Sequence, residues 1–137
     1  MAWTVTETLE KEQYVGGKLT MFRVKLACVS DVNASDHDIG SVNKNVLNAI
    51  NGAYLYLIKI VPGTGGDAPS GTFDLDIEDG EDDHLVDSDA NTEAANSFVS
   101  GSASLGVFPP ILDTCSLVCA TLGDGNKADI YLYFTRS

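Results

Sequence analysis

The sequence has few basic residues. Eight of its 137 residues are lysine or arginine, against twenty aspartates and glutamates, so the formal net charge is −12. Sequence-independent binding to nucleic acid depends on lysine and arginine displacing counterions from phosphates, so this shortage argues against that function. The same negative field would repel an anionic membrane surface. We therefore expect neither a nucleic-acid partner nor a membrane partner.

Long apolar runs and targeting signals are also missing from the sequence. The longest apolar candidate, residues 53–61, has about half the length of a membrane span and contains Lys59. Residues 1–6 include neither a basic region nor an apolar region, so we predict no signal peptide. We expect a soluble protein that is made in the cytoplasm.

Cysteine is sparse. The three cysteines are Cys28, Cys115 and Cys119, an odd number that does not make a disulfide scaffold. Cys115 and Cys119 lie four residues apart in an apolar run, and no second pair of cysteines or histidines completes a zinc motif. We therefore predict free thiols that pack as small hydrophobic side chains.

Catalytic and phosphate-binding motifs are not present either. No Gly-x-Ser-x-Gly sequence places a serine on a sharp strand-to-helix turn. Residues 63–66 are similar to a phosphate-binding loop only in glycine content, because no lysine follows them. Carboxylates are numerous, but the sequence does not show the separation that a catalytic pair needs. We predict that the protein is not an enzyme and that it has no cofactor.

What the sequence does contain is alternation of apolar and polar residues with a period of two. Residues 20–28 predict a half-buried strand with a basic side facing solvent, and residues 73–78 and 129–134 alternate in the same way. Residues 53–58 are apolar at every position, which predicts a central strand covered on both faces. The N-terminal run alternates threonine with a second set of residues, which are Trp3, Val5 and Glu7.

Turn residues separate the predicted strands. Gly16-Gly17 should join the first two strands as a hairpin, and residues 61–71 should form a loop. Residues 122–128 should connect the last two strands as a C-terminal hairpin. Helical signals are limited to two short segments, residues 41–52 with Ser41 as the cap and residues 88–98, and each could equally be a loop that carries a single turn.

These elements predict an all-β protein. We expect a single antiparallel β-sandwich or flattened β-barrel of about seven or eight strands, with at most one or two short helical turns. No linker or internal repeat divides the chain, so residues 1–137 should form a single β domain. Residues 1–12 should form an N-terminal arm or an edge strand of this domain.

The segment from residue 74 to residue 83 has seven acidic residues in ten. Calcium prefers carboxylate oxygens, so the candidate metal ligands are Asp74, Asp76, Glu78 and Asp79. An EF-hand loop needs glycine at its sixth position and glutamate at its twelfth, and neither register of this segment supplies them. We therefore favour a solvated acidic strand face without a bound metal.

Tyrosines occupy alternate positions in two of the predicted strands. They are Tyr54, Tyr56, Tyr131 and Tyr133. Such residues could form a stacking platform, but a net charge of −12 does not attract nucleic acid. Two alternatives stay open: a sugar-binding surface, and rings that are buried between strands or subunits while their hydroxyls reach water. We favour the second.

Three segments form an ordered set along the chain. They are Thr4-Val5-Thr6-Glu7-Thr8 before the glycine turn, Ile60-Val61-Pro62-Gly63 with Phe73-Asp74-Leu75-Asp76-Ile77-Glu78-Asp79-Gly80, and the C-terminal hairpin from Gly125 to Phe134. The set resembles the small β-rich virion proteins encoded in the structural gene blocks of tailed bacteriophages. Residues 81–84 are more acidic than this pattern, and cysteines replace aliphatic residues in the last hairpin.

The resemblance implies a structural component of the virion, made in the host cytoplasm, and most simply a capsid decoration (cement) protein. Such a protein would form a homo-oligomer, commonly a trimer, and would bind the major capsid protein or another virion protein. A location in the tail or at the head–tail junction is one alternative, and a calcium- or carbohydrate-binding β module is another.

The contacts of such a protein should come from its N-terminal edge strand. An edge strand can pair with a neighbouring chain, and a tryptophan near a chain end suits a partner's pocket, although Trp3 could equally pack into the protein's own core. The predicted partner-interface residues are Trp3, Val5, Leu9, Tyr131 and Tyr133. Charge is also polarised, because eleven of the twenty acidic residues lie between Asp67 and Glu93, whereas six of the eight basic residues lie at or before Lys59.

Overall fold

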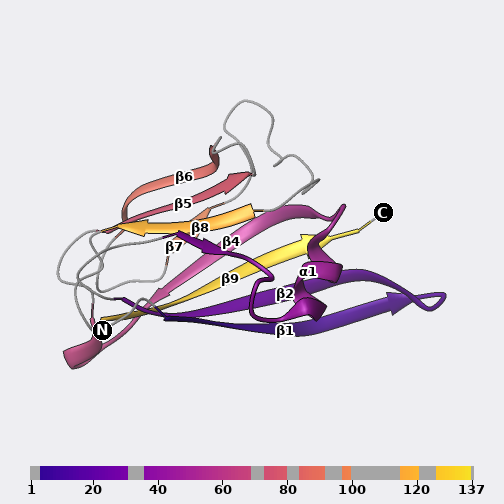
Figure 1. Ribbon diagram of the computed structural model, residues 1–137, viewed down its shortest axis with the longest axis horizontal. Helices are drawn as coiled ribbons and strands as arrows, with labels where there is room; N and C mark the ends of the chain where they lie inside the picture. The colour runs from indigo at the N-terminus through magenta and orange to yellow at the C-terminus, as the bar shows by residue number, and fades with distance from the viewer. Residues whose placement is uncertain are drawn as a thin grey trace.

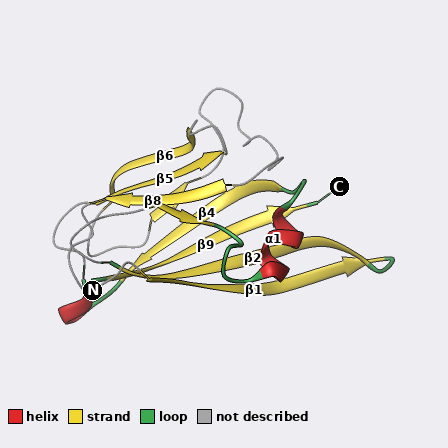
Figure 2. Cartoon of the chain, viewed as in Figure 1, coloured by secondary structure: helices red, strands yellow, loops and turns green. Residues whose placement is uncertain are grey.

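The computed structural model describes residues 4–30, 36–68, 73–79, 84–91, 97–99, 115–120 and 126–136. In these residues the structure has two antiparallel sheets, one short helix and one 3-10 turn (Figure 1, Figure 2). This architecture confirms the all-β prediction. Within the described ranges the two sheets remain separate and do not close into a barrel.

The larger sheet has five strands. In order across the sheet they are β1 (Thr4–Val15), β2 (Lys18–Val29), β9 (Lys127–Thr135), β4 (Tyr54–Pro62) and β7 (Ser97–Val99). The smaller sheet consists of β3 (Asp36–Asp38), β8 (Cys115–Ala120), β5 (Phe73–Asp79) and β6 (His84–Asn91). The helix α1 (Lys44–Ile50) follows β3, and the 3-10 turn η1 (Gly65–Asp67) follows β4.

The core lies on the inner face of the five-stranded sheet. Alternate residues of β2 and β9 are almost completely buried, namely Phe22, Val24, Leu26, Ile130, Leu132 and Phe134. The rings of Phe22 and Phe134 stack with centroids 5.1 Å apart. The smaller sheet and α1 add apolar residues to the same cluster, including Leu75, Ile77, Leu117, Val46 and Ile50. Each large side chain buried in this way stabilises the fold by about 1.5–3 kcal/mol.

The hairpin predicted at Gly16-Gly17 is confirmed. Val15 pairs with Lys18 across the turn, and the two glycines have φ angles of 59° and 80°. A two-residue turn with positive φ at both positions matches the twist of the strands and favours glycine. The pairing of β2 with β9 begins at Met21, so the end of this hairpin projects beyond β9 (Figure 1). β1 itself lies at one edge of the sheet.

Strand β4 corrects the prediction that residues 53–58 are covered on both faces. Leu55 and Ile58 are buried, but Tyr54 and Tyr56 are 41% and 38% exposed. The apolar run was misleading because its outward positions are tyrosines, whose rings tolerate partial contact with water. The strand also continues through Pro62, so the predicted loop begins later than residue 61. Pro62 is the last residue of the strand, where its missing N–H interrupts little of the ladder.

The predicted C-terminal hairpin is wrong. β8 pairs with β3 and β5 in the smaller sheet, whereas β9 pairs with β2 and β4 in the larger one. Both strands have an apolar inward face, and covering the common core from two sides outweighs pairing between neighbours in sequence.

Both helical predictions also change. Residues 88–91 belong to β6 and residues 97–98 belong to β7, so these parts of the predicted segment are strand and not helix, and residues 92–96 lie outside the described residues. The segment at 41–52 does contain α1, but its cap is Asn43, whose side chain accepts a hydrogen bond from the Asn45 N–H, and not Ser41.

Candidate functional site

The outer face of the five-stranded sheet carries cations and tyrosines near its centre. Alternate residues of a strand point to opposite faces, so the residues between the buried ones on β2, β9 and β4 point away from the core. We call the group of five residues the cation–tyrosine face. Its members are Arg23, Lys25, Lys59, Tyr131 and Tyr133, and each is half-buried.

Strand register brings the cation–tyrosine face together from distant parts of the sequence. Tyr131 pairs with Lys25 on one side and with Lys59 on the other, so these residues form one row across three strands. Arg23 pairs with Tyr133 in the adjacent row. Neighbouring strands lie about 4.8 Å apart, so the backbones of the two lysines are about 10 Å apart.

The Tyr131 ring is the centre of this group. The Arg23 guanidinium carbon lies 4.4 Å from the ring centroid, and the Nζ atoms of Lys59 and Lys25 lie 5.6 Å and 5.9 Å from it. A cation within about 6 Å of an aromatic centroid is attracted by the negative face of the ring. One tyrosine therefore holds three positive charges close together.

Arg23 is the most firmly fixed of the three cations. Its Nη2 and Nε atoms lie 2.9 Å and 3.0 Å from Glu10 Oε1, and its Nη1 donates a hydrogen bond to the Tyr133 hydroxyl at 3.3 Å. The hydrogen bond to Tyr133 raises the pKa of Arg23, burial opposes the shift, and the Glu10 carboxylate adds to it. Arg23 is therefore charged and locked to two neighbouring strands.

Among the described residues, the ammonium groups of the two lysines have fewer polar partners than the Arg23 guanidinium. Lys25 Nζ lies 3.9 Å from Asp129 Oδ2, at the long limit for an ion pair. Lys59 forms no ion pair with any residue that the structure describes, and its ammonium group faces the Tyr131 ring. Among the described residues three cations thus meet two carboxylates, which leaves a positive face on a chain whose net charge is −12.

Aromatic surface continues from the cation–tyrosine face along β4. The rings of Tyr56 and Tyr133 are tilted at 57° with centroids 6.2 Å apart. Tyr54 and Tyr56 are among the exposed large hydrophobic side chains of the chain. The two tyrosine pairs predicted from sequence therefore lie on one surface, because β4 and β9 are neighbours.

The predicted interface residues are not all on this surface. Tyr131 and Tyr133 belong to the cation–tyrosine face, whereas Val5 is 7% exposed and belongs to the chain's own core. Leu9 is half-buried and packs against that core. Trp3 lies outside the described residues. A partner role for the N-terminal strand stays a prediction, with Val5 already used in internal packing.

The acidic candidates lie on β5, where Asp74, Asp76 and Glu78 alternate with buried Leu75 and Ile77 and Asp79 is the last residue of the strand. Asp76 and Glu78 are half-buried, and the side chains of Asp74 and Asp79 are outside the described part of the chain. Among the side chains that the structure describes, no three His, Cys, Asp or Glu residues gather as a metal site requires.

A buried carboxylate, Glu7, forms the most completely hydrogen-bonded site in the described chain. Its side chain is 0% exposed and its Oε2 lies 2.8 Å from His37 Nε2. The same oxygen accepts a hydrogen bond from the Gly40 N–H at 2.6 Å, and Oε1 accepts from the Val42 and Asn43 N–H groups at 3.0 Å and 2.7 Å. Glu7 therefore ties β1 to the loop that precedes α1, which is a structural role.

Sequence reasoning missed the role of Glu7, although one signal was present. Glu7 has the same phase in the N-terminal strand as Val5, so an inward position was already indicated by the alternation. A glutamate at an inward position must find hydrogen-bond donors, because an unpaired buried charge is very costly.

The prediction of free buried thiols is confirmed for Cys28 and Cys115. Burial raises the pKa of the Cys115 thiol to about 12, and the carboxylates of Glu7 and Asp38 add to the shift. Because the thiolate is the nucleophilic form, Cys115 is unreactive at neutral pH. The side chain of Cys119 lies outside the described residues.

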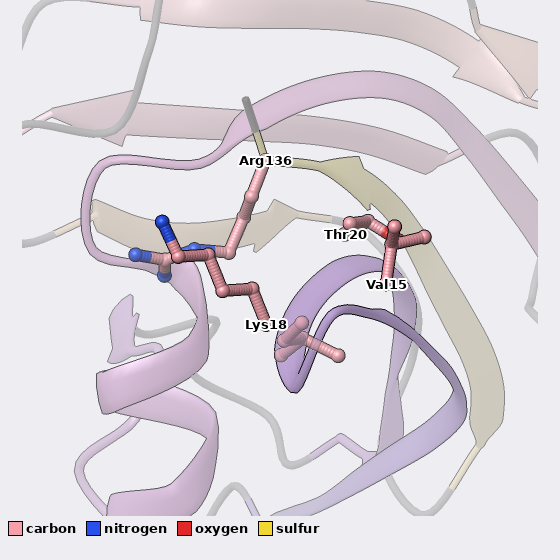
Figure 3. Close-up of a pocket in the computed structure, with 5 residues that line it drawn as sticks. Val15, Lys18, Thr20 and Arg136 are labelled. Atoms are coloured by element: carbon pink, nitrogen blue, oxygen red, sulfur yellow. The ribbon is translucent and has the colours of Figure 1, made fainter.

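A pocket of about 470 Å³ opens beside the end of the β1–β2 hairpin (Figure 3). The residues that line it are Val15, Lys18, Leu19, Thr20 and Arg136. Arg136 Nη1 donates hydrogen bonds to carbonyl oxygens at the end of α1, those of Asn48, Ala49 and Asn51. The arginine is thus engaged in holding the helix to the sheet, and the pocket gathers no acid and base for catalysis.

Comparisons with protein-family models, with curated proteins and with solved structures gave no match. In the part of the chain that the structure describes, no helix has the length and apolar character needed to cross a membrane.

Proposed function

We propose that this chain is a non-enzymatic structural protein of a bacteriophage virion, which binds the assembled coat through the cation–tyrosine face. The proposed role is that of a capsid decoration protein that stabilises the head. The observation that carries the proposal is the gathering of three of the eight basic residues around the ring of Tyr131. Tyrosine and arginine are enriched among the residues that dominate binding energy at protein interfaces.

The cation–tyrosine face is well suited to docking because its strands and its arginine are held in place before binding. They lie on three paired strands, and Arg23 is fixed by Glu10 and Tyr133. Side chains that are already ordered lose little conformational entropy on association. A positive surface on an otherwise acidic protein also orients the molecule as it approaches a negatively charged partner.

The resemblance to small virion proteins supports the virion as the place of action. The major capsid protein, or another virion protein, is the proposed partner, and the protein itself is proposed to assemble as a trimer on the head. A location in the tail or at the head–tail junction is the nearest alternative. It differs in copy number and symmetry, which an image of the particle would report.

The test is sedimentation with particles assembled from the proposed partner, a major capsid protein. We expect the chain to sediment with assembled particles and not to bind free coat subunits. The double variant Lys25→Gln/Lys59→Gln should lose most of this binding, whereas Lys44→Gln, an exposed lysine on α1, should retain it. A chain that stays in the supernatant with every particle would overturn the proposal.

A carbohydrate-binding role is the second candidate, because Tyr54 and Tyr56 are exposed on β4 and the Tyr56 ring lies beside the Tyr133 ring. Aromatic rings on a flat surface can pack against the apolar faces of sugars. A glycan that raised the melting temperature of the chain, by binding only its folded form, would favour this role. No shift across a glycan panel would remove it.

A further inference from the structure

The three cations of the cation–tyrosine face differ in what they can still bind. Arg23 already contacts Glu10 through two nitrogens and the Tyr133 hydroxyl through the third. A lysine ammonium has three N–H donors. Lys25 has one carboxylate at 3.9 Å, and Lys59 has an aromatic ring but no ion pair among the described residues. Arg23 therefore positions the tyrosines, and the two lysines have donors left for a partner.

The two lysines lie on either side of one ring. They form a row with Tyr131, and the row continues to Thr8, which is exposed and pairs with Lys25. In an extended peptide, residues at alternate positions lie about 7 Å apart on one side. The backbones of Lys25 and Lys59 are about 10 Å apart, and the Nζ atoms of the two lysines lie 5.9 Å and 5.6 Å from the Tyr131 ring centroid. Two carboxylates about 7 Å apart on one side of a peptide can therefore each contact one of the two ammonium groups.

The size of the positive region limits the length of a negatively charged partner. Interactions between exposed charges are screened beyond a Debye length of about 8–10 Å. A short acidic segment would contact only the cation–tyrosine face. A long polyanion, such as nucleic acid or a sulfated polysaccharide, would extend over the rest of a chain that carries −12 and would be repelled.

A second copy of this chain is a poorer partner than an external protein. The chain has acidic residues at alternate positions of β5, but Asp76 and Glu78 are half-buried and each already interacts within its own chain.

We infer that the cation–tyrosine face binds a short, extended segment of the partner protein that carries carboxylates at alternate positions, with Lys25 and Lys59 as the charge contacts and Tyr131 between them. This inference rests on the proposed function for the identity of the partner, because the acidic segment would belong to the coat. The binding chemistry itself can be measured without particles.

The experiment uses fluorescein-labelled peptides of eight residues and fluorescence anisotropy at low salt. The full chain should bind the peptide of alternating aspartate and threonine and should not bind the peptide of alternating lysine and threonine. The double variant Lys25→Gln/Lys59→Gln should weaken binding of the aspartate peptide about tenfold or more, and added salt should weaken it further. Lys44→Gln should bind as the unchanged chain does.

The remaining measurements distinguish a specific site from a general charge effect. Tyr131→Phe should keep most of the binding, because the ring remains, whereas Tyr131→Leu should weaken it severalfold. Equal binding of the aspartate peptide by the chain and by the double lysine variant would overturn the inference. Tighter binding of a heparin fragment than of the peptide, or self-association that the double lysine variant abolishes, would also overturn it.

The two proposals fail in different ways. Sedimentation of the unchanged chain and of the double lysine variant with particles to the same extent would overturn the lysine contacts and leave the virion role standing. Binding of the aspartate peptide without any particle binding would overturn the virion role and leave the acidic-segment site standing.

Discussion

Glu7 and Lys59 are charged residues on two strands of the same sheet, yet the fold surrounds them in opposite ways. Glu7 is completely buried and has four hydrogen-bond partners, three of which are backbone N–H groups. Lys59 lies on the outer face, with an aromatic ring beside it and no ion pair among the described residues. A charge whose partners are all internal maintains the fold, whereas a charge with unused donors can bind another molecule.

The energies of the two sites should differ accordingly. Removing one partner of a buried charge interaction typically costs 3–5 kcal/mol, because the remaining groups stay buried without a partner. Exposed ion pairs contribute about 0–1 kcal/mol. Substitutions at the Glu7 site should therefore reduce stability, and substitutions at Lys25 or Lys59 should reduce binding only.

The largest effect is expected from Glu7→Ala. The substitution leaves the N–H groups of Gly40, Val42 and Asn43 buried or half-buried without their acceptor, so the free energy of unfolding should fall by about 4 kcal/mol. Glu7→Gln keeps one oxygen acceptor and should cost about half as much. Urea denaturation measures both. Glu12→Gln, at an exposed position of the same strand, is the matched control and should change stability by less than about 0.5 kcal/mol. A loss below about 1 kcal/mol for Glu7→Ala would contradict the structural role.

The loop that binds Glu7 should be nearly as sensitive at Gly40. Its φ angle is 94°, and an added Cβ would lie 2.7 Å from the Leu47 Cβ, so alanine would be strained and would also clash with α1. Gly40→Ala should lower the free energy of unfolding by about 2–3 kcal/mol. Gly66→Ala is the control, because an added Cβ there meets nothing within 4 Å. Similar melting temperatures for the two variants would show that the loop adapts to the substitution.

Cys115 gives the buried region a dependence on pH. Its pKa in the folded protein is about 12, against an ordinary value of 9.0, so the unfolded chain releases this proton first as the pH rises. Stability should therefore fall between about pH 9 and pH 12, by about 1.4 kcal/mol for each pH unit from this group alone. Urea unfolding at pH 8 and pH 10, compared with the same pair for Cys115→Ala, isolates its contribution. At pH 8 the alanine variant should be less stable than the unchanged chain. Between pH 8 and pH 10 its free energy of unfolding should fall by less than that of the unchanged chain, and equal falls would contradict the prediction.

The buried region was easier to predict from sequence than the exposed one. Alternation in residues 20–28 correctly placed Phe22, Val24 and Leu26 in the core, and Gly16-Gly17 correctly predicted the hairpin. Both depend on local chemistry: a side-chain period of two, and a turn that needs positive φ. Alternation also placed Arg23 on the solvent side of its strand.

The cation–tyrosine face could not be predicted from these local patterns, because it depends on the pairing of β9 with β2 and β4, which are both far from β9 in the sequence. Which strands become neighbours depends on how two sheets and a helix cover one core, and local patterns do not contain that information. The wrong C-terminal hairpin has the same cause. It paired β8 with β9, and so did not place Tyr131 between Lys25 and Lys59.

The smallest stability effect is expected from the double variant Lys25→Gln/Lys59→Gln. Lys25 has a weak ion pair at 3.9 Å, and both ammonium groups contact the Tyr131 ring from a half-buried surface. Partly exposed cation–π contacts contribute about 0.5–1 kcal/mol each, and removing two neighbouring positive charges relieves their mutual repulsion and their repulsion with Arg23. The free energy of unfolding should therefore change by less than about 1 kcal/mol in urea denaturation, while binding to particles falls. A loss as large as that of Glu7→Ala would show that the lysines hold the sheet together, and the contrast between a structural charge and a binding charge would then be wrong for this molecule.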